Sequence, residues 1–170
     1  MILTGSEIRK QVKSGTIVID PFNLDSLNPN SYNYRLGEYY AVLSTADVVD
    51  SSRPPILEMQ HIPAEGLVLL PNALYLCSTL EVIGSVDYVT RLIGKSSLGR
   101  LGLYLQISAD LGHQGSIHQW TLELRCVRPL KIYAGMVIGQ VTFWRPQGER
   151  LEWFGYYASF NAPTASRGNT

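Results

Sequence analysis

Hydrophobic positions along the chain change their period after Gly15. Before it, Ile8 and Val12 lie four residues apart and share one face of a helix, and Thr4 and Glu7 have the spacing of a capping box. Gly15 supplies a helix stop, because glycine readily takes the left-handed conformation that ends a helix. The pattern predicts one short helix over residues 5–14.

After this helix, apolar residues come in short or alternating runs, which are typical of strands. Breaks at residues 28–30, 53–55 and 71–72 contain proline or asparagine, which favour turns. Many short strands with irregular turns predict a sandwich or a barrel. The predicted strands cover residues 16–19, 32–36, 39–43, 66–70, 74–79, 88–93, 103–107, 120–127, 130–133 and 136–144.

The composition fits one folded domain and excludes some partners. The chain has 170 residues, of which 45% are hydrophobic, so it can bury a core. No internal repeat or linker divides it. Lys and Arg together number 14, as do Asp and Glu, so the net charge is zero. Without a net positive charge, the chain is not expected to hold a nucleic-acid polymer. A small anion needs only a local group of hydrogen-bond donors, so it is not excluded.

Both cysteines lie in apolar runs, Cys77 within residues 74–78 and Cys126 within residues 122–127. No Cys-x-x-Cys motif or Cys/His cluster surrounds them, so we predict two buried free thiols, as suits a reducing compartment. The N-terminus has no secretory hydrophobic region, and no apolar run approaches the roughly 18 residues that span a bilayer. We therefore expect a cytoplasmic protein with no membrane partner.

A polar turn follows the strand that we predict to end at Ile93. Residues 94–103 read Gly-Lys-Ser-Ser-Leu-Gly-Arg-Leu-Gly-Leu. A helical turn over 96–100 would add backbone N–H donors to the hydroxyls and positive charges, which favours phosphate. It is not a Walker A loop, because Val89 stands where that motif needs glycine. Taken alone, the segment fits either a phosphate site or an ordinary polar turn.

One carboxylate interrupts the strand predicted at residues 120–127. Alternation places Leu122 and Leu124 on one face of the strand and Thr121, Glu123 and Arg125 on the other. A carboxylate that is buried without a partner is costly. Glu123 therefore either forms a surface ion pair, with Arg125 or a neighbouring strand, or faces a pocket where it transfers protons.

The three histidines, His61, His113 and His118, lack the partners of a zinc site. A zinc deaminase would need His-x-Glu and Pro-Cys-x-x-Cys, and neither motif is present. The Gly-x-Ser-x-Gly elbow of many hydrolases is also missing. We expect no protein-bound cofactor and no catalytic metal held by protein side chains.

Four ordered segments together resemble the dCTP deaminase family, and the first is the polar turn at residues 94–103. The others are Trp-Thr-Leu-Glu-Leu at 120–124, Asn-Ser-Tyr-Asn-Tyr-Arg-Leu-Gly at 30–37, and Gly-Met-Val-Ile-Gly-Gln at 135–140. The first two align with the family without a gap. The N-terminal residues 1–22 also resemble the family, so the resemblance covers nearly the whole chain.

The resemblance implies a mainly β fold, a distorted jelly roll or β-barrel of the dUTPase-like type with a short N-terminal helix. It implies a β domain over residues 1–155 and a C-terminal tail, residues 156–170, that closes over the active site. It also implies a homotrimer with its sites at subunit interfaces.

The resemblance further implies a metal-free reaction. Glu123 takes a proton from water as hydroxide attacks C4 of a cytosine nucleotide, by default dCTP, and passes it to N3 and the departing ammonia. Ser96 and Arg100 position Glu123, the water and the phosphates, and Lys95 and Ser97 face the phosphates. Mg²⁺ accompanies the triphosphate and is bound through the phosphates rather than a protein cage.

Other residues are implied as substrate contacts. Backbone groups near Ser108 and Ala109 read the edge of the base, and Arg167 in the tail is a phosphate partner. The remaining candidates for substrate binding are His113, Gln119, Trp120 and Tyr157.

The chain departs from the family at several of these positions. His113 stands where the family has an aspartate near the sugar, Ser116 replaces a bulky residue, and His118 replaces a glycine. In the tail, Tyr156 and Phe160 replace a polar clamp. These changes predict altered specificity, and they leave open the sugar, the number of phosphates and a modified cytosine. The alternatives are a dUTPase-like pyrophosphatase, which the missing aspartate disfavours, and a non-catalytic nucleotide-binding regulator.

Overall fold

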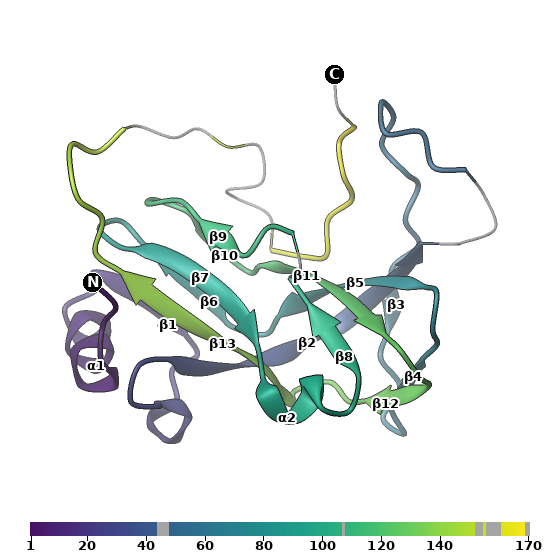
Figure 1. The fold of residues 1–170 in the computed structure, drawn as a ribbon, viewed down its shortest axis with the longest axis horizontal. Helices are drawn as coiled ribbons and strands as arrows, with labels where there is room; N and C mark the ends of the chain where they lie inside the picture. The colour runs from purple at the N-terminus through teal and green to yellow at the C-terminus, as the bar shows by residue number, and fades with distance from the viewer. Residues whose placement is uncertain (44–47, 107, 152–154, 156–160, 169–170) are drawn as a thin grey trace.

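The computed structural model describes residues 1–43, 48–106, 108–151, 155 and 161–168. The fold is mainly β, as predicted, with one N-terminal helix (Figure 1). The helical elements are α1 (Gly5–Lys13), the 3₁₀ turn η1 (Leu24–Ser26) and α2 (Ser96–Gly99). The strands are β1 (Ile17–Asp20), β2 (Tyr32–Leu43), β3 (Gln60–His61), β4 (Leu67–Leu69), β5 (Leu74–Thr79), β6 (Val82–Ser85), β7 (Val89–Gly94), β8 (Leu103–Leu105), β9 (Leu111–Gly112), β10 (Ile117–His118), β11 (Thr121–Cys126), β12 (Leu130–Ile132) and β13 (Val137–Trp144).

Helix α1 forms for the reasons that its sequence suggests. The Thr4 hydroxyl accepts a hydrogen bond from the Glu7 N–H at 3.4 Å, and Ile8 is fully buried. Gly15 follows the helix with φ of +78°, the left-handed conformation that favours glycine. Both ends of α1 agree closely with the predicted range of residues 5–14.

The largest sheet has the strand order β8-β11-β5-β2-β13-β7-β9, and β3 also pairs with β2. Strand β2 connects its two halves, because residues 32–35 pair with β13 whereas most of residues 36–43 pair with β5. The pairing with β5 shifts register between Leu36 and Tyr40. Two smaller sheets, β1-β6-β10 and β12-β4, complete the architecture.

The large sheet curls so that strands far apart in its order approach each other. A Cβ atom built on Gly94, at the end of β7, would lie 3.1 Å from a methyl carbon of Leu105 in β8. Strands β7 and β8 are also in contact, although four strands separate them in the sheet. This curvature agrees with the barrel-like fold that the sequence predicts.

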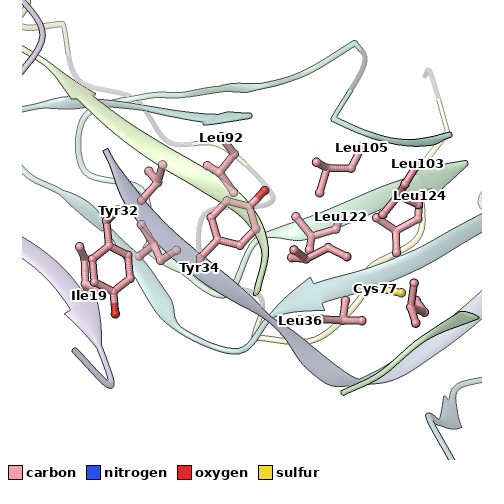
Figure 2. Packing of buried hydrophobic residues seen from close by; sticks show 14 of the residues in the cluster. Ile19, Tyr32, Tyr34, Leu36, Cys77, Leu92, Leu103, Leu105, Leu122 and Leu124 are labelled. Atoms are coloured by element: carbon pink, nitrogen blue, oxygen red, sulfur yellow. The ribbon is translucent and has the colours of Figure 1, made fainter. Parts of the chain in front are cut away.

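Buried side chains from both halves of the sheet meet in one core (Figure 2). Tyr34 and Leu36 of β2 pack in the same cluster as Cys77 of β5 and Leu122 and Leu124 of β11. The prediction of two buried free thiols is confirmed. Burial also raises the pKa of Tyr34, because an ionised phenol would be poorly solvated in this core.

The observed strands differ from the predicted ones by one merger and by several short additions. Residues 32–36 and 39–43 form one strand rather than two, because Gly37 has no side chain and lies directly against Ser78 of β5. Strands β3, β9 and β10 contain two residues each, too few to show a period. Among the described residues, no helix is both long and apolar enough to cross a membrane.

Candidate active site

Glu123 lies at the centre of a strand that is paired on both sides. Strand β11 pairs antiparallel with β5, where Leu76 is opposite Glu123, and with β8, where Leu105 is opposite Leu124. Leu122 and Leu124 are fully buried, whereas Glu123 is half-buried on the other face. The predicted alternation is therefore confirmed. In the described part of the chain Glu123 makes no ion pair, so the surface ion-pair interpretation finds no partner there.

Thr121 lies two residues before Glu123 on the same face and receives two hydrogen bonds. Its backbone carbonyl accepts from the side-chain amide of Gln106 at 3.1 Å, and its hydroxyl accepts from the backbone N–H of Thr164 at 3.1 Å. Nearby, the side chain of Asn161 accepts from the Gln119 N–H at 3.1 Å. The described part of the tail, residues 161–168, is thus attached where the strand of Glu123 begins.

The polar turn after β7 is a single helical turn, α2, which is the conformation considered above for a phosphate site. The carbonyl of Lys95 accepts from the N–H groups of Leu98 and Gly99 at 3.0 and 2.9 Å. Ser96, Ser97 and Arg100 are exposed, while Lys95 is half-buried. The turn therefore presents hydroxyls and positive charge to its surroundings, as a site for an anion requires.

Within one chain, α2 and Glu123 lie at different levels of the sheet. Gly102, just after the turn, accepts from the N–H of Val127 at 3.0 Å, and Val127 lies four residues beyond Glu123. That separation is about 13 Å along a strand. In the described residues no hydrogen bond or ion pair joins Glu123 to Ser96 or Arg100. The chain that follows Arg100 is therefore attached to the sheet beyond Glu123.

The segment implied to read the base leaves the sheet after β8. Gln106 has φ of +52°, and Ser108 and Ala109 beyond it are exposed. Asp110 returns the chain to β7, where its carbonyl accepts from the Leu92 N–H at 2.9 Å and its carboxylate pairs with Arg91 at 2.6 Å. The exposed residues Ser108 and Ala109 therefore lie directly before a residue that is bonded to β7.

Of the residues that depart from the family, Tyr156 and Phe160 lie outside the described residues, and the other three lie in and after one tight turn. His113 is exposed, and its carbonyl accepts from the Ser116 N–H at 3.2 Å across Gly115, which has φ of +90°. Ser116 is fully buried, and its hydroxyl has no hydrogen-bond partner in the described part of the chain. Its backbone lies directly against Gly84. His118 is buried, with its ring centroid 4.3 Å from that of Trp120.

Gln119 and Trp120, which the sequence suggested for substrate binding, donate side-chain hydrogen bonds to backbone carbonyls between β5 and the end of β6. The Gln119 side chain donates to the Leu80 carbonyl at 2.8 Å, and the Trp120 indole donates to the Ile83 carbonyl at 2.9 Å. Both side chains are half-buried. Arg167 is exposed in the tail, and Tyr157 lies outside the described residues.

Sequence reasoning did not identify Gln106 or Thr121 as parts of this site. Alternation gave no signal for Gln106, because a polar residue between Leu105 and Ile107 fits the outward face of a predicted strand. As for metals, no group of three or more His, Cys, Asp or Glu side chains is arranged as metal ligands in the part of the chain that the structure describes.

Comparison with known proteins decides the family. A family model described as dCTP deaminase-like matches residues 2–146, nearly the whole chain. The chain belongs to the dCTP deaminase-like family. This membership confirms the resemblance that the four sequence segments indicated. It also means that the β11 and α2 segments described above are elements of a dCTP deaminase-like domain.

Curated relatives of this dCTP deaminase-like chain match most of its length. A dCTP deaminase from Rhodopirellula baltica is 43% identical over 152 residues, covering 89% of this chain and 76% of that protein. A dUMP-forming dCTP deaminase from Clostridium acetobutylicum is 42% identical over 143 residues, covering 84% of this chain and 82% of that protein.

Among solved structures, a 2′-deoxycytidine 5′-triphosphate deaminase from Agrobacterium tumefaciens has a similar fold. The TM-score is 0.66 at 21% sequence identity, over 84% of this chain. The dCTP deaminase-like chain spans 47% of that protein, about half its length. This likeness confirms the fold class.

Proposed function

We propose that the chain is a hydrolytic deaminase of a cytosine nucleotide, by default dCTP, with Glu123 as the general base. The observation that carries this proposal is a half-buried carboxylate, without an ion-pair partner in the described chain, on a strand paired on both sides. Such a carboxylate is held in a fixed direction and has lone pairs available for a proton. Membership of the dCTP deaminase-like family and the names of the relatives support the same reaction.

In the proposed reaction, Glu123 removes a proton from water and the resulting hydroxide adds to C4 of cytosine. The C4–N3 double bond opens as N3 takes up a proton. Glu123, having passed the first proton to N3, then takes the proton of the new C4 hydroxyl and delivers it to the amino group, so that C4=O forms as the C4–N bond breaks and ammonia leaves. One water is consumed, one ammonia is released, and a uracil nucleotide remains.

The anion turn completes the proposed site from a neighbouring subunit. Because α2 and Glu123 are at different levels of one chain, a second copy that presents its own Ser96 and Arg100 would supply the missing donors. Lys95 and Ser97 would face the phosphates, and Mg²⁺ would enter as part of the nucleotide complex. We therefore propose a homotrimer with interfacial sites, and a tail that covers each of them.

Replacement of Glu123 by glutamine tests the proposal most directly. The amide cannot accept a proton from water, so we expect ammonia release from dCTP to fall about 10²–10⁴-fold while nucleotide binding persists. Glu38→Gln is the matched control, because Glu38 is an exposed strand carboxylate with only a 3.8 Å contact to His61. Equal ammonia release by the wild-type protein and Glu123→Gln would remove Glu123 from the mechanism.

A second activity is favoured by the names of relatives. Several of them, from Clostridium acetobutylicum, Clostridium beijerinckii and Leptospira biflexa, are dUMP-forming dCTP deaminases. His113 opposes this activity here, because a histidine lacks the fixed negative charge of the family's aspartate. Measuring ammonia and pyrophosphate in one reaction separates the two. Ammonia alone indicates a dUTP-forming enzyme, both products indicate a dUMP-forming one, and pyrophosphate alone would contradict deamination.

A further inference from the structure

Gln106 occupies an unusual position where β8 leaves the sheet. Its backbone has φ of +52°, a conformation that residues other than glycine and asparagine seldom adopt. The residue is only 8% exposed. A polar side chain with a strained backbone is thus buried one residue after the last paired position of β8.

The two polar atoms of the Gln106 side-chain amide differ in their hydrogen bonding. Its nitrogen donates to the Thr121 carbonyl at 3.1 Å. This bond fixes the orientation of the amide, because a carbonyl accepts hydrogen bonds only, so the nitrogen must face Thr121. The amide oxygen is buried and has no hydrogen-bond partner among the residues that the structure describes.

A residue whose only role was to end the strand would need neither the strained backbone nor the unsatisfied amide oxygen. Glycine or asparagine would take the same backbone conformation more easily, and an apolar side chain would fill the space without a stranded oxygen. The structure keeps glutamine despite both penalties. Strain and unsatisfied polar atoms of this kind gather at functional sites.

Gln106 joins the two parts of the site that must be aligned for deamination. Its backbone leads from Leu105, paired with Leu124 of β11, toward the exposed segment at Ser108 and Ala109. Its side chain returns to Thr121, two residues before Glu123. The backbone pairing between β8 and β11 ends at Leu105. The Gln106 side-chain amide therefore supplies the next hydrogen bond between these two segments of the chain.

We propose that Gln106 is a positioning residue, which fixes Glu123 relative to the segment that reads the base. This inference rests on the proposed function, since it assigns Gln106 to the same deamination site. Deamination needs the general base and C4 in a fixed relation, and small errors in such alignment slow the chemical step strongly. The bond to Thr121 therefore matters for turnover more than for nucleotide affinity.

Two substitutions test the role of this bond. Gln106→Met keeps the length of the side chain but cannot donate to Thr121. Gln106→His restores a donor on a residue that tolerates positive φ comparatively well. Gln11→Met is the matched control, because Gln11 loses a comparable bond, to Glu7 at 2.7 Å in α1. All variants are assayed well below their melting temperatures, which are measured in parallel.

We expect Gln106→Met to lower kcat for ammonia release by about tenfold or more, with KM changed by less than about threefold. Gln106→His should recover most of the lost kcat, and Gln11→Met should match the wild-type protein. If Gln106→Met loses only thermal stability and keeps kcat, the residue is merely structural and the inference is wrong. If the wild-type protein releases no ammonia, the proposed function fails instead.

Hydrogen exchange tests the same link without activity. In Gln106→Met, amides within residues 103–112 and 119–126 should exchange faster than in Gln11→Met, because both segments lose their common attachment. Unchanged exchange in both segments would overturn the inference even in an inactive protein.

Discussion

The strand of Glu123 and the turn of Arg100 hold the groups that we propose for catalysis and phosphate binding in opposite ways. Strand β11 is paired on both sides, and alternate residues are anchored in the core. Turn α2 has four residues, none of them buried, and no side chain caps its start. A general base must point at one atom, so a rigid strand suits it. Donors to phosphate satisfy a larger and more symmetrical group, so an exposed turn is adequate.

The largest effect that we expect concerns the sheet that holds β11, at Glu81, which follows the neighbouring strand β5. Glu81 is fully buried and accepts from the Arg35 side chain at 2.7 Å and from the Arg35 N–H at 2.9 Å. Glu81→Ala leaves these donors without their acceptor, so we expect the free energy of unfolding to fall by about 3 kcal/mol. Urea denaturation measures the change.

The exposed pair between Arg91 and Asp110 provides the control for Glu81. Their side chains are 50% and 31% exposed, so Asp110→Asn should cost about 1 kcal/mol or less. Equal losses in the two variants would mean that the sheet around β2 and β5 is no more dependent on its buried ion pair than on an exposed one.

A smaller effect is expected for the exposed side, and it should appear in binding rather than stability. Arg100→Ala removes one charge-assisted contact to phosphate, so we expect nucleotide affinity to fall about 10–100-fold with an unchanged melting temperature. Titration of the nucleotide and thermal unfolding check the two parts. Arg9→Ala, on the exposed face of α1, is the matched control. A large loss of stability with full affinity would reverse the roles that we assign to the two regions.

The smallest effect concerns the backbone of the turn itself. A Cβ atom on Gly99 meets nothing within 4 Å, and Gly99 is within helix α2. Gly99→Ala should therefore raise the free energy of unfolding by about 0.4–1 kcal/mol. Gly15 has equally open space but a φ of +78°, so Gly15→Ala should lower it. If Gly99→Ala destabilises the protein like Gly15→Ala, the turn is more constrained than its exposure suggests.

Local patterns predicted the elements whose signals are contained in their own residues. Strand β5 occupies the predicted residues, and α1 agrees closely because its cap and its apolar spacing lie within a few residues. Strand β6 was not predicted, since its four residues are defined by pairing with β1 and β10, which are distant in sequence. Pairing of this kind depends on tertiary contacts, which a hydrophobic period cannot show.

The candidate site divides in the same way. The face of Glu123 follows from the spacing of apolar residues, so the sequence predicted it, whereas the helical turn at Ser96 was only one of two conformations left open. The separation of Glu123 from Arg100 within one chain does not follow from spacing, because it depends on how β8 pairs with β11. Gln106 was missed for a similar reason, because the role that we propose for it depends on one hydrogen bond to Thr121, which lies on a strand later in the sequence.

The thiol of Cys77 has a practical use. It is fully buried on the central strand β5, beside Tyr40 and Leu122, and burial raises its pKa to about 12. Alkylating dyes react with the thiolate, which is about one part in ten thousand of this group at pH 8. Dye uptake at Cys77, resolved from that at Cys126 by peptide mapping of the purified protein, therefore measures how often the core around β5 opens.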